Sequence, residues 1–178
     1  MKQKGQIVEI LPTSPIYSSD LSSSLSTETD FLSASQKRQY SLFDGILVGE
    51  HDGWSNFRLG QRKGINVGSK KKPLYVIGIN KKENRVFVGE GIDHPGLLTK
   101  VIAIEKNENI DYKKILTLEN NTPVELKIEL ENHSVPAFFY EFEHYIFIRL
   151  NKLFRIDLFN HKISIHYKNT MLLNIFIP

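Results

Sequence analysis

The strongest constraint on the fold is the alternation of apolar and charged residues over 124–131. Such a period-two pattern predicts a strand with one buried face and one face in water. Further short strands are expected in this half of the chain, at 98–105, 115–118, 135–142, 145–150, 154–159, 162–167 and 171–177. This density predicts a C-terminal antiparallel β-barrel of about six to eight strands.

The first half of the chain also favours β-structure. We expect strands at 6–11, 46–48, 73–79 and 85–88, with a hairpin loop at 80–84. The 11 Phe and 7 Tyr residues favour strands over helices. An all-β chain of two domains is therefore predicted, a small β domain at 1–93 and the barrel at 94–178, with the boundary near His94-Pro95.

A serine-rich insert, 12–41, interrupts the first domain. Ten serines and few large apolar residues lie between Ser14 and Ser41, so we expect mostly a surface loop whose deletion leaves stability unchanged. Within it, Thr27-Glu-Thr-Asp30 precedes Phe31 and predicts a capping box and a short helix.

Positive charge is concentrated in one part of the chain. The chain carries a net charge of +3, yet residues 58–85 contain nine Lys or Arg and one acid, Glu83. The rest of the chain is therefore acidic. This distribution predicts one surface that faces a polyanion. The alternative is a solvated loop without a ligand.

Composition excludes several kinds of site. Without cysteine, this polypeptide can form no disulfide, no thiolate metal site and no cysteine nucleophile. The six histidines are scattered without His-x3-His spacing, so we expect no metal site. No signal-like apolar core and no run near the roughly 18 apolar residues of a membrane span occur, so we expect a soluble cytoplasmic protein.

Three groups of side chains have both a functional and a plain interpretation. His51 could act in acid–base chemistry or be a turn residue bonded to the backbone. Glu141 and Glu143 could form a carboxylate pair or face solvent. Trp54 and Phe57 could stack on an unpaired base or fill the core.

A series of short motifs resembles the tRNA-specific 2-thiouridylase (MnmA) family. The motifs occur in the family's order and extend over the small β domain. They are Gly5-Gln-Ile-Val8, Gly49-Glu-His-Asp-Gly53, Leu59-Gly-Gln-Arg-Lys-Gly-Ile65, Pro73-Leu-Tyr-Val76, Asn84-Arg-Val-Phe-Val-Gly89 and His94-Pro95.

The resemblance covers the family's central domain and C-terminal β-barrel. Family members begin with a PP-loop domain that binds ATP and carries catalytic Asp and Cys residues, and a second Cys carries sulfur as a persulfide. Neither the loop nor a cysteine occurs in this sequence. The resemblance therefore implies the tRNA-binding and scaffolding portion of a tRNA-uridine 2-sulfurtransferase that thiolates the wobble uridine. It implies no catalytic residue and no cofactor here, since ATP and the persulfide donor belong to the complete enzyme.

The resemblance also implies partners and contact residues. The partners would be tRNA, a separate PP-loop domain or subunit and a sulfur-relay protein, with no membrane. The residues expected to bind tRNA or to dock the catalytic domain are Gln61, Arg62, Lys63, Lys70, Lys71 and Lys72. Where the family barrel has Arg-Tyr-Arg-Gln, this chain has Glu129-Leu-Glu-Asn132, and carboxylates repel phosphates. The alternative is a diverged stand-alone binding or interaction module without tRNA modification activity.

Overall fold

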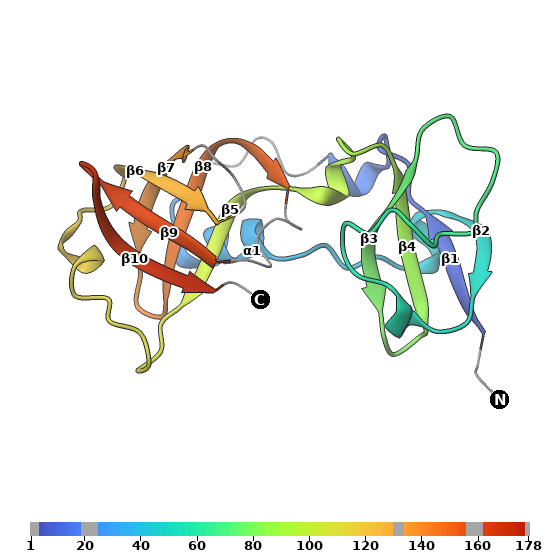
Figure 1. The fold of residues 1–178 in the computed structure, drawn as a ribbon, viewed down its shortest axis with the longest axis horizontal. Coiled ribbons are helices and arrows are strands. Elements are labelled where there is room, and N and C mark those ends of the chain that lie inside the picture. The colour runs from blue at the N-terminus through green and yellow to red at the C-terminus, as the bar shows by residue number, and fades with distance from the viewer. Residues whose placement is uncertain (1–3, 19–24, 130–133, 156–161, 177–178) are drawn as a thin grey trace. The chain divides into compact units, whose positions relative to one another are not determined.

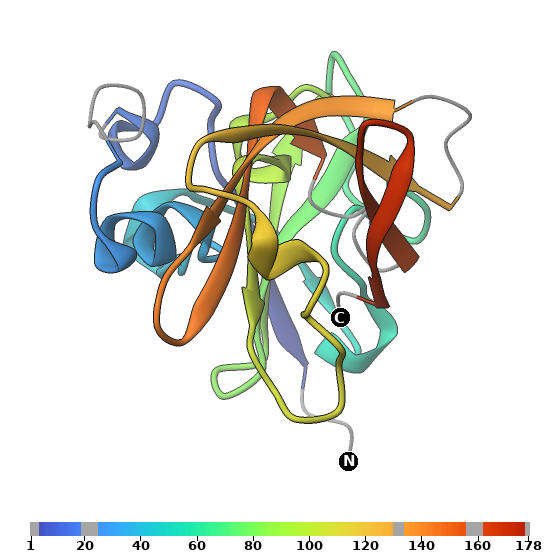
Figure 2. The same ribbon diagram turned by 90° about the vertical axis from the view of Figure 1, so that its left-hand side faces the viewer.

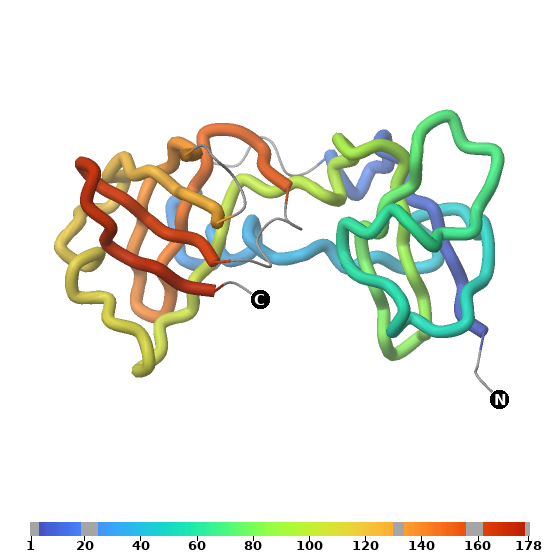
Figure 3. Tube along the Cα trace, viewed as in Figure 1, coloured from blue at the N-terminus to red at the C-terminus, as the bar shows by residue number. Residues whose placement is uncertain are grey.

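The computed structural model describes residues 4–18, 25–129, 134–155 and 162–176. These ranges form ten strands, one α-helix and five short 3-10 helices, which confirms the predicted mostly-β class. The chain divides into two compact units, 1–23 with 37–98 and 24–36 with 99–178. The trace in Figure 3 shows the chain entering the second unit at the α-helix and returning to the first.

Unit 1 contains a four-stranded sheet with the order β2-β1-β4-β3 (Figure 1). Strand β1 is antiparallel to β2 and parallel to β4, while β3 and β4 form an antiparallel hairpin. The four strands are β1 (Gly5–Glu9), β2 (Ile46–His51), β3 (Leu74–Asn80) and β4 (Arg85–Glu90).

Both faces of this sheet are covered. Ile7 and Val8 of β1 are buried in two different clusters, because successive side chains of a strand point to opposite faces. Strand β4 shows the same arrangement, since Phe87 belongs to the cluster of Val8, whereas Val86 and Val88 belong to the cluster of Ile7. A strand covered on both faces appears as a continuous apolar run, as Val86-Phe-Val88 does.

His94 lies inside unit 1, which extends to Leu98, although the domain boundary was expected near His94-Pro95. Its side chain is 1% exposed. The backbone N–H of Gly96 donates to His94 Nδ1 (3.1 Å), so Nε2 carries the proton and donates to the Ile10 carbonyl (3.0 Å). Burial lowers the pKa of His94. The His94-Pro95 motif therefore holds the end of β1 in the core.

Unit 2 contains a six-stranded sheet with the order β10-β9-β6-β7-β8-β5. This agrees with the expected six or more antiparallel strands. In β6, Val124, Leu126 and Ile128 are buried while Glu125 and Lys127 are exposed, so the predicted alternation is confirmed over 124–128; residues 130–131 of the expected strand lie outside the described part. The strands are β5 (Leu98–Glu105), β6 (Thr122–Ile128), β7 (Ser134–Glu141), β8 (Tyr145–Arg155), β9 (Lys162–Tyr167) and β10 (Thr170–Phe176).

Two expectations in unit 2 were wrong, namely a break between the strands at 145–150 and 154–159 and a strand at 115–118. The strands expected at 145–150 and 154–159 form one continuous strand, β8, up to Arg155, and 156–159 lie outside the described residues. The strand expected at 115–118 is the 3-10 helix η5 (Ile115–Thr117). Ile115 is fully buried against the sheet, so this short apolar segment packs on the core as a 3-10 turn and does not pair as a strand. Periodicity cannot distinguish these cases over four residues.

The serine-rich insert contributes to unit 2. Helix α1 (Glu28–Ser35) begins with the predicted capping box: Thr27 accepts from the Asp30 N–H (3.2 Å), and Asp30 accepts from the Thr27 N–H (2.9 Å). Phe31 is 1% exposed, and Figure 2 shows α1 beside the hairpin of β7 and β8. The expectation that the whole insert is dispensable is wrong, because Phe31 fills core space. Residues 19–24 lie outside the described part.

Candidate functional site

The loop that connects η3 (Trp54–Asn56) to β3 carries all six residues predicted to bind tRNA. It is fixed to β3 in both directions, because the Gly60 N–H donates to the Val76 carbonyl (2.8 Å) and the Val76 N–H donates to the Gln61 carbonyl (2.9 Å). Gly60 and Gly64 have φ values of 77° and 81°. Glycine adopts this left-handed conformation without steric cost, so the turn can form.

The Gln61 side chain closes this turn. Its Oε1 accepts from the Arg58 N–H (2.9 Å), and its Nε2 donates to the Lys63 carbonyl (2.8 Å). The amide is therefore a positioning group within the loop. Arg62 and Lys63 are exposed, and no hydrogen bond or ion pair joins either side chain to another residue in the described ranges. Both cations are thus available to a ligand.

Arg62 and the three consecutive lysines share one hollow of about 460 Å³, which we call the basic hollow. Lys63 does not line it, and Gln61 faces elsewhere. The structure thus brings together four of the six predicted residues. The lining of the basic hollow consists of Arg62, Ile65, Val67, Ser69, Lys70, Lys71, Lys72, Pro73 and Leu74.

The three lysines of the basic hollow differ in their partners. Lys70 forms an ion pair with Glu9, whose side chain is only 4% exposed. A buried carboxylate needs a partner, so Lys70 holds the loop against β1. Lys72 Nζ lies 3.9 Å from Asp93 in an exposed pair. Lys71 is exposed and pairs with no residue in the part of the chain that the structure describes.

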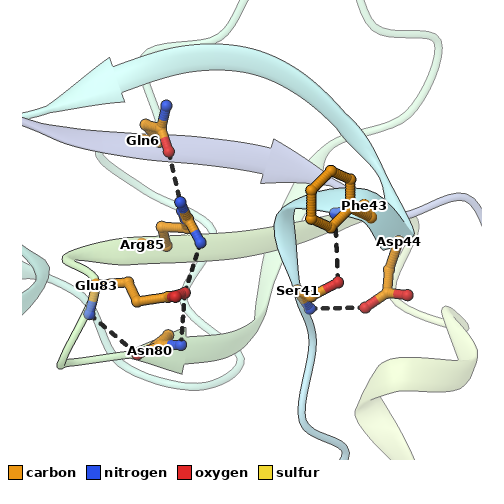
Figure 4. Close-up of polar contacts among 7 residues, drawn as sticks. All are labelled: Gln6, Ser41, Phe43, Asp44, Asn80, Glu83 and Arg85. Atoms are coloured by element: carbon orange, nitrogen blue, oxygen red, sulfur yellow. Dashed lines mark hydrogen bonds and ion pairs between the residues drawn. The ribbon is translucent and has the colours of Figure 1, made fainter.

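Arg85, the last cation of the basic stretch, stabilises the β3–β4 hairpin. Its Nε donates to Gln6 Oε1 (2.9 Å), and its Nη1 pairs with Glu83 Oε2 (2.5 Å), as Figure 4 shows. Asn80 Nδ2 donates to the same carboxylate (2.9 Å). Arg85 therefore joins the hairpin to β1 and is engaged within the fold.

A second hollow, of about 280 Å³, adjoins the same loop, and we call it the polar hollow. Phe57 lines it but is 8% exposed and packs edge-on against His51, with ring centroids 5.1 Å apart. Trp54 is half-buried beneath the Lys81 ammonium. The lining consists of Lys4, Ile7, Glu50, His51, Asp52, Asn56, Phe57, Gln61, Gly64 and Asn66.

Phe57 and His51 both have structural roles in unit 1. Phe57 belongs to a core cluster of unit 1. His51 Nδ1 accepts from the Gly53 N–H (3.0 Å), as expected of a turn residue. Burial lowers the pKa of His51, while backbone contacts at Gly53 and Asn84 oppose that shift. The neutral imidazole is therefore favoured, and the ring lines the polar hollow beside Phe57.

In unit 2, Glu141 pairs with Lys106 (2.6 Å), so its carboxylate is engaged in an ion pair. In the described ranges, no helix combines the length and apolar character needed to cross a membrane. Those ranges also contain no cluster of three or more His, Asp or Glu side chains able to hold a metal ion.

Comparison with known proteins gives concordant matches. Residues 30–90 match the family model described as the tRNA methyl transferase PRC-barrel domain. The tRNA-specific 2-thiouridylase of Flavobacterium johnsoniae is 34% identical over 124 residues, which cover 70% of this chain and 31% of that protein. That of Karelsulcia muelleri is 34% identical over 140 residues, covering 79% and 34%. This chain is a relative of the tRNA-specific 2-thiouridylases. The expected resemblance is confirmed.

A third 2-thiouridylase, from Halalkalibacterium halodurans, is 37% identical over 100 residues, 54% of this chain and 25% of that protein. The chain thus spans about a third or less of the length of these relatives. The segment matched by the family model contains the whole basic hollow and most of the polar hollow.

The polar hollow was not foreseen from the sequence. Its one local signal is the alternation of Gly64 and Asn66 with Ile65 and Val67, which predicts an extended segment with two different faces.

Proposed function

We propose that this chain is the tRNA-binding and scaffolding portion of a tRNA-uridine 2-sulfurtransferase. The supporting observation is that two exposed cations without partners in the described ranges, Arg62 and Lys71, line one hollow together with Lys70 and Lys72. Cations that neutralise phosphates supply most of the affinity in sequence-independent RNA binding. The relatives' names concern tRNA, which makes tRNA the polyanion best suited to this hollow.

In this proposal, some side chains of the loop stabilise its conformation and others bind phosphates. Gln61 and Lys70 hold the loop, because their polar groups are engaged within unit 1. Arg62, Lys63 and Lys71 contact phosphates. Lys72 joins them, since its pair with Asp93 is 63% and 75% exposed and such pairs contribute little to stability. A phosphate can therefore replace Asp93 as the partner of Lys72.

Catalysis belongs to another part of the enzyme. Sulfur transfer requires a thiolate nucleophile, and this chain contains no cysteine. In this proposal the chain holds tRNA for a PP-loop domain or subunit, which supplies the ATP site, while a sulfur-relay protein delivers persulfide sulfur. The chain itself contributes binding and orientation.

A charge-reversal experiment tests the proposal. The parent chain and Arg62→Glu with Lys71→Glu are titrated against fluorescein-labelled bulk tRNA by fluorescence polarisation. We expect at least roughly tenfold weaker binding and a salt slope smaller by about 2, because two phosphate contacts are lost. The matched control, Lys37→Glu with Lys113→Glu, makes the same charge change at exposed sites outside the basic stretch. Equal weakening in both double variants would contradict the proposal.

One observation favours the second candidate, a diverged interaction module. Glu129 is exposed directly after β6, where the resemblance implies a cation in the family barrel. Its neighbour Glu131 lies outside the described residues. If the parent chain shows no salt-dependent affinity for tRNA while remaining folded, this second function replaces the first.

A further inference from the structure

One short segment, residues 61–67, separates the two hollows of unit 1. Gln61, Gly64 and Asn66 line the polar hollow, whereas Arg62, Ile65 and Val67 line the basic hollow. Over 64–67, successive residues line the polar hollow and the basic hollow alternately, as expected for an extended chain. Successive Cα atoms are about 3.8 Å apart, so the two hollows lie back to back across one thickness of backbone.

The two hollows differ in charge. The basic hollow carries four cations, of which Lys70 is paired with the buried Glu9 and Lys72 with the exposed Asp93. In the polar hollow, Lys4 pairs with Glu50 (3.3 Å), which leaves the carboxylate of Asp52 as the uncompensated charge. A phosphate is therefore attracted to one side of the segment and repelled from the other.

The remaining lining of the polar hollow suits a flat, neutral, hydrogen-bonding group. Phe57 and the His51 ring form an aromatic wall. The side-chain amides of Asn56 and Asn66 are exposed at the rim, and neither bonds to another residue in the described ranges. Each amide offers a donor and an acceptor. Asp52 adds acceptors only, which favours a ligand edge that carries N–H donors.

We infer that the polar hollow receives one unpaired nucleobase of the RNA whose phosphates occupy the basic hollow, and that it prefers bases with an exocyclic amino group. This inference rests on the proposed function. Carboxylates accept hydrogen bonds from the amino group of cytosine, and unpaired bases are recognised by stacking together with hydrogen bonds to their edges. Uracil has no such amino group, and its one edge N–H lies between two carbonyl oxygens that repel a carboxylate, so Asp52 discriminates against it.

Single-stranded hexanucleotides test this preference. The full chain is titrated by fluorescence polarisation with fluorescein-labelled hexamers of cytidine, adenosine and uridine at fixed salt. We expect the cytidine and adenosine hexamers to bind at least about fivefold more tightly than the uridine hexamer, since one good base contact discriminates by a factor of this order or more.

Two variants of the polar hollow and one matched control locate the preference. Asp52→Asn should reduce the cytidine-to-uridine affinity ratio to less than about twofold, because an amide also presents donors to the amino group. Glu108→Gln makes the same charge change at an exposed site of unit 2 and should leave the ratio unchanged. Asn66→Ala should lower the affinity for all three hexamers.

The outcomes separate the two proposals. Equal binding of the three hexamers, binding of tRNA without measurable binding of any hexamer, or an unchanged ratio in Asp52→Asn would overturn the nucleobase site and leave the proposed function standing. If the parent chain binds neither tRNA nor any hexamer, the proposed function itself fails.

Discussion

Replacing Phe31 with alanine tests whether the serine-rich insert is an integral part of unit 2. Phe31 is 1% exposed, and its ring centroid lies 4.5 Å from that of Tyr140, 5.6 Å from that of Phe142 and 5.2 Å from that of Phe147. A buried Phe→Ala change costs about 3–5 kcal/mol through lost transfer free energy and the cavity that remains. For a unit of this size, a loss of about 3 kcal/mol lowers the Tm by at least about 12 °C.

Native-state hydrogen exchange measures this loss in unit 2 alone. Amides of β7 and β8 should exchange through an opening whose free energy is about 3 kcal/mol lower than in the parent. Fluorescence of Trp54, the sole tryptophan, follows unit 1 and should change little. The matched control is Phe43→Ala, at a phenylalanine that is 95% exposed beside the Ser41–Asp44 cap drawn in Figure 4. A loss below about 1 kcal/mol for Phe31→Ala, equal to the control, would refute the packing argument.

Two further predictions concern unit 1, and urea unfolding followed by Trp54 fluorescence measures both. Lys70→Met should lower the free energy of unfolding by about 3 kcal/mol because Glu9 becomes an unpaired buried carboxylate. The double variant Lys70→Met with Glu9→Gln should recover part of the lost stability, because no buried charge remains. A Lys70→Met variant as stable as the parent would contradict the prediction. Burial holds the pKa of His94 below its usual 6.5, so below that pH the unfolded chain binds a proton that the folded chain rejects. The contribution of His94 to stability should therefore be constant above about pH 6.5 and fall on acidification by up to about 1.4 kcal/mol per pH unit. The stability of His94→Gln should fall less steeply with acidification. A flat stability profile of the parent down to about pH 5 would be inconsistent with the burial of His94.

The sequence predicted those strands best that have one buried face. The expected strand 162–167 coincides with β9, because its alternation specifies both the conformation and the buried face. Ile115 was assigned to a strand because apolar character alone does not reveal whether a short run pairs with a neighbour or covers a core. The burial of Phe31 was not predicted, because the polar composition around it indicated a surface loop, whereas one large aromatic side chain is enough to anchor the segment in the core.

The sequence predicted the positive charge of the candidate site, but it did not predict which side chains stabilise the loop and which face a ligand. Nine cations in one stretch indicated a polyanion-binding surface, yet nothing local distinguishes Lys70 from Lys71. Only the fold places Glu9, 61 residues away in the sequence, beneath Lys70, and only the fold turns Gln61 into the group that closes the loop. The polar hollow depends on β1, β2 and the loop together, so no single stretch of sequence could reveal it.

The salt dependence of tRNA binding by the parent chain tests the central claim most directly. Polarisation titrations with labelled bulk tRNA over a range of potassium chloride concentrations give the slope of log affinity against log salt. Four phosphate contacts, from Arg62, Lys63, Lys71 and Lys72, predict a slope of about −3. A slope near zero, or no affinity at low salt, would contradict the claim that this loop binds the tRNA backbone.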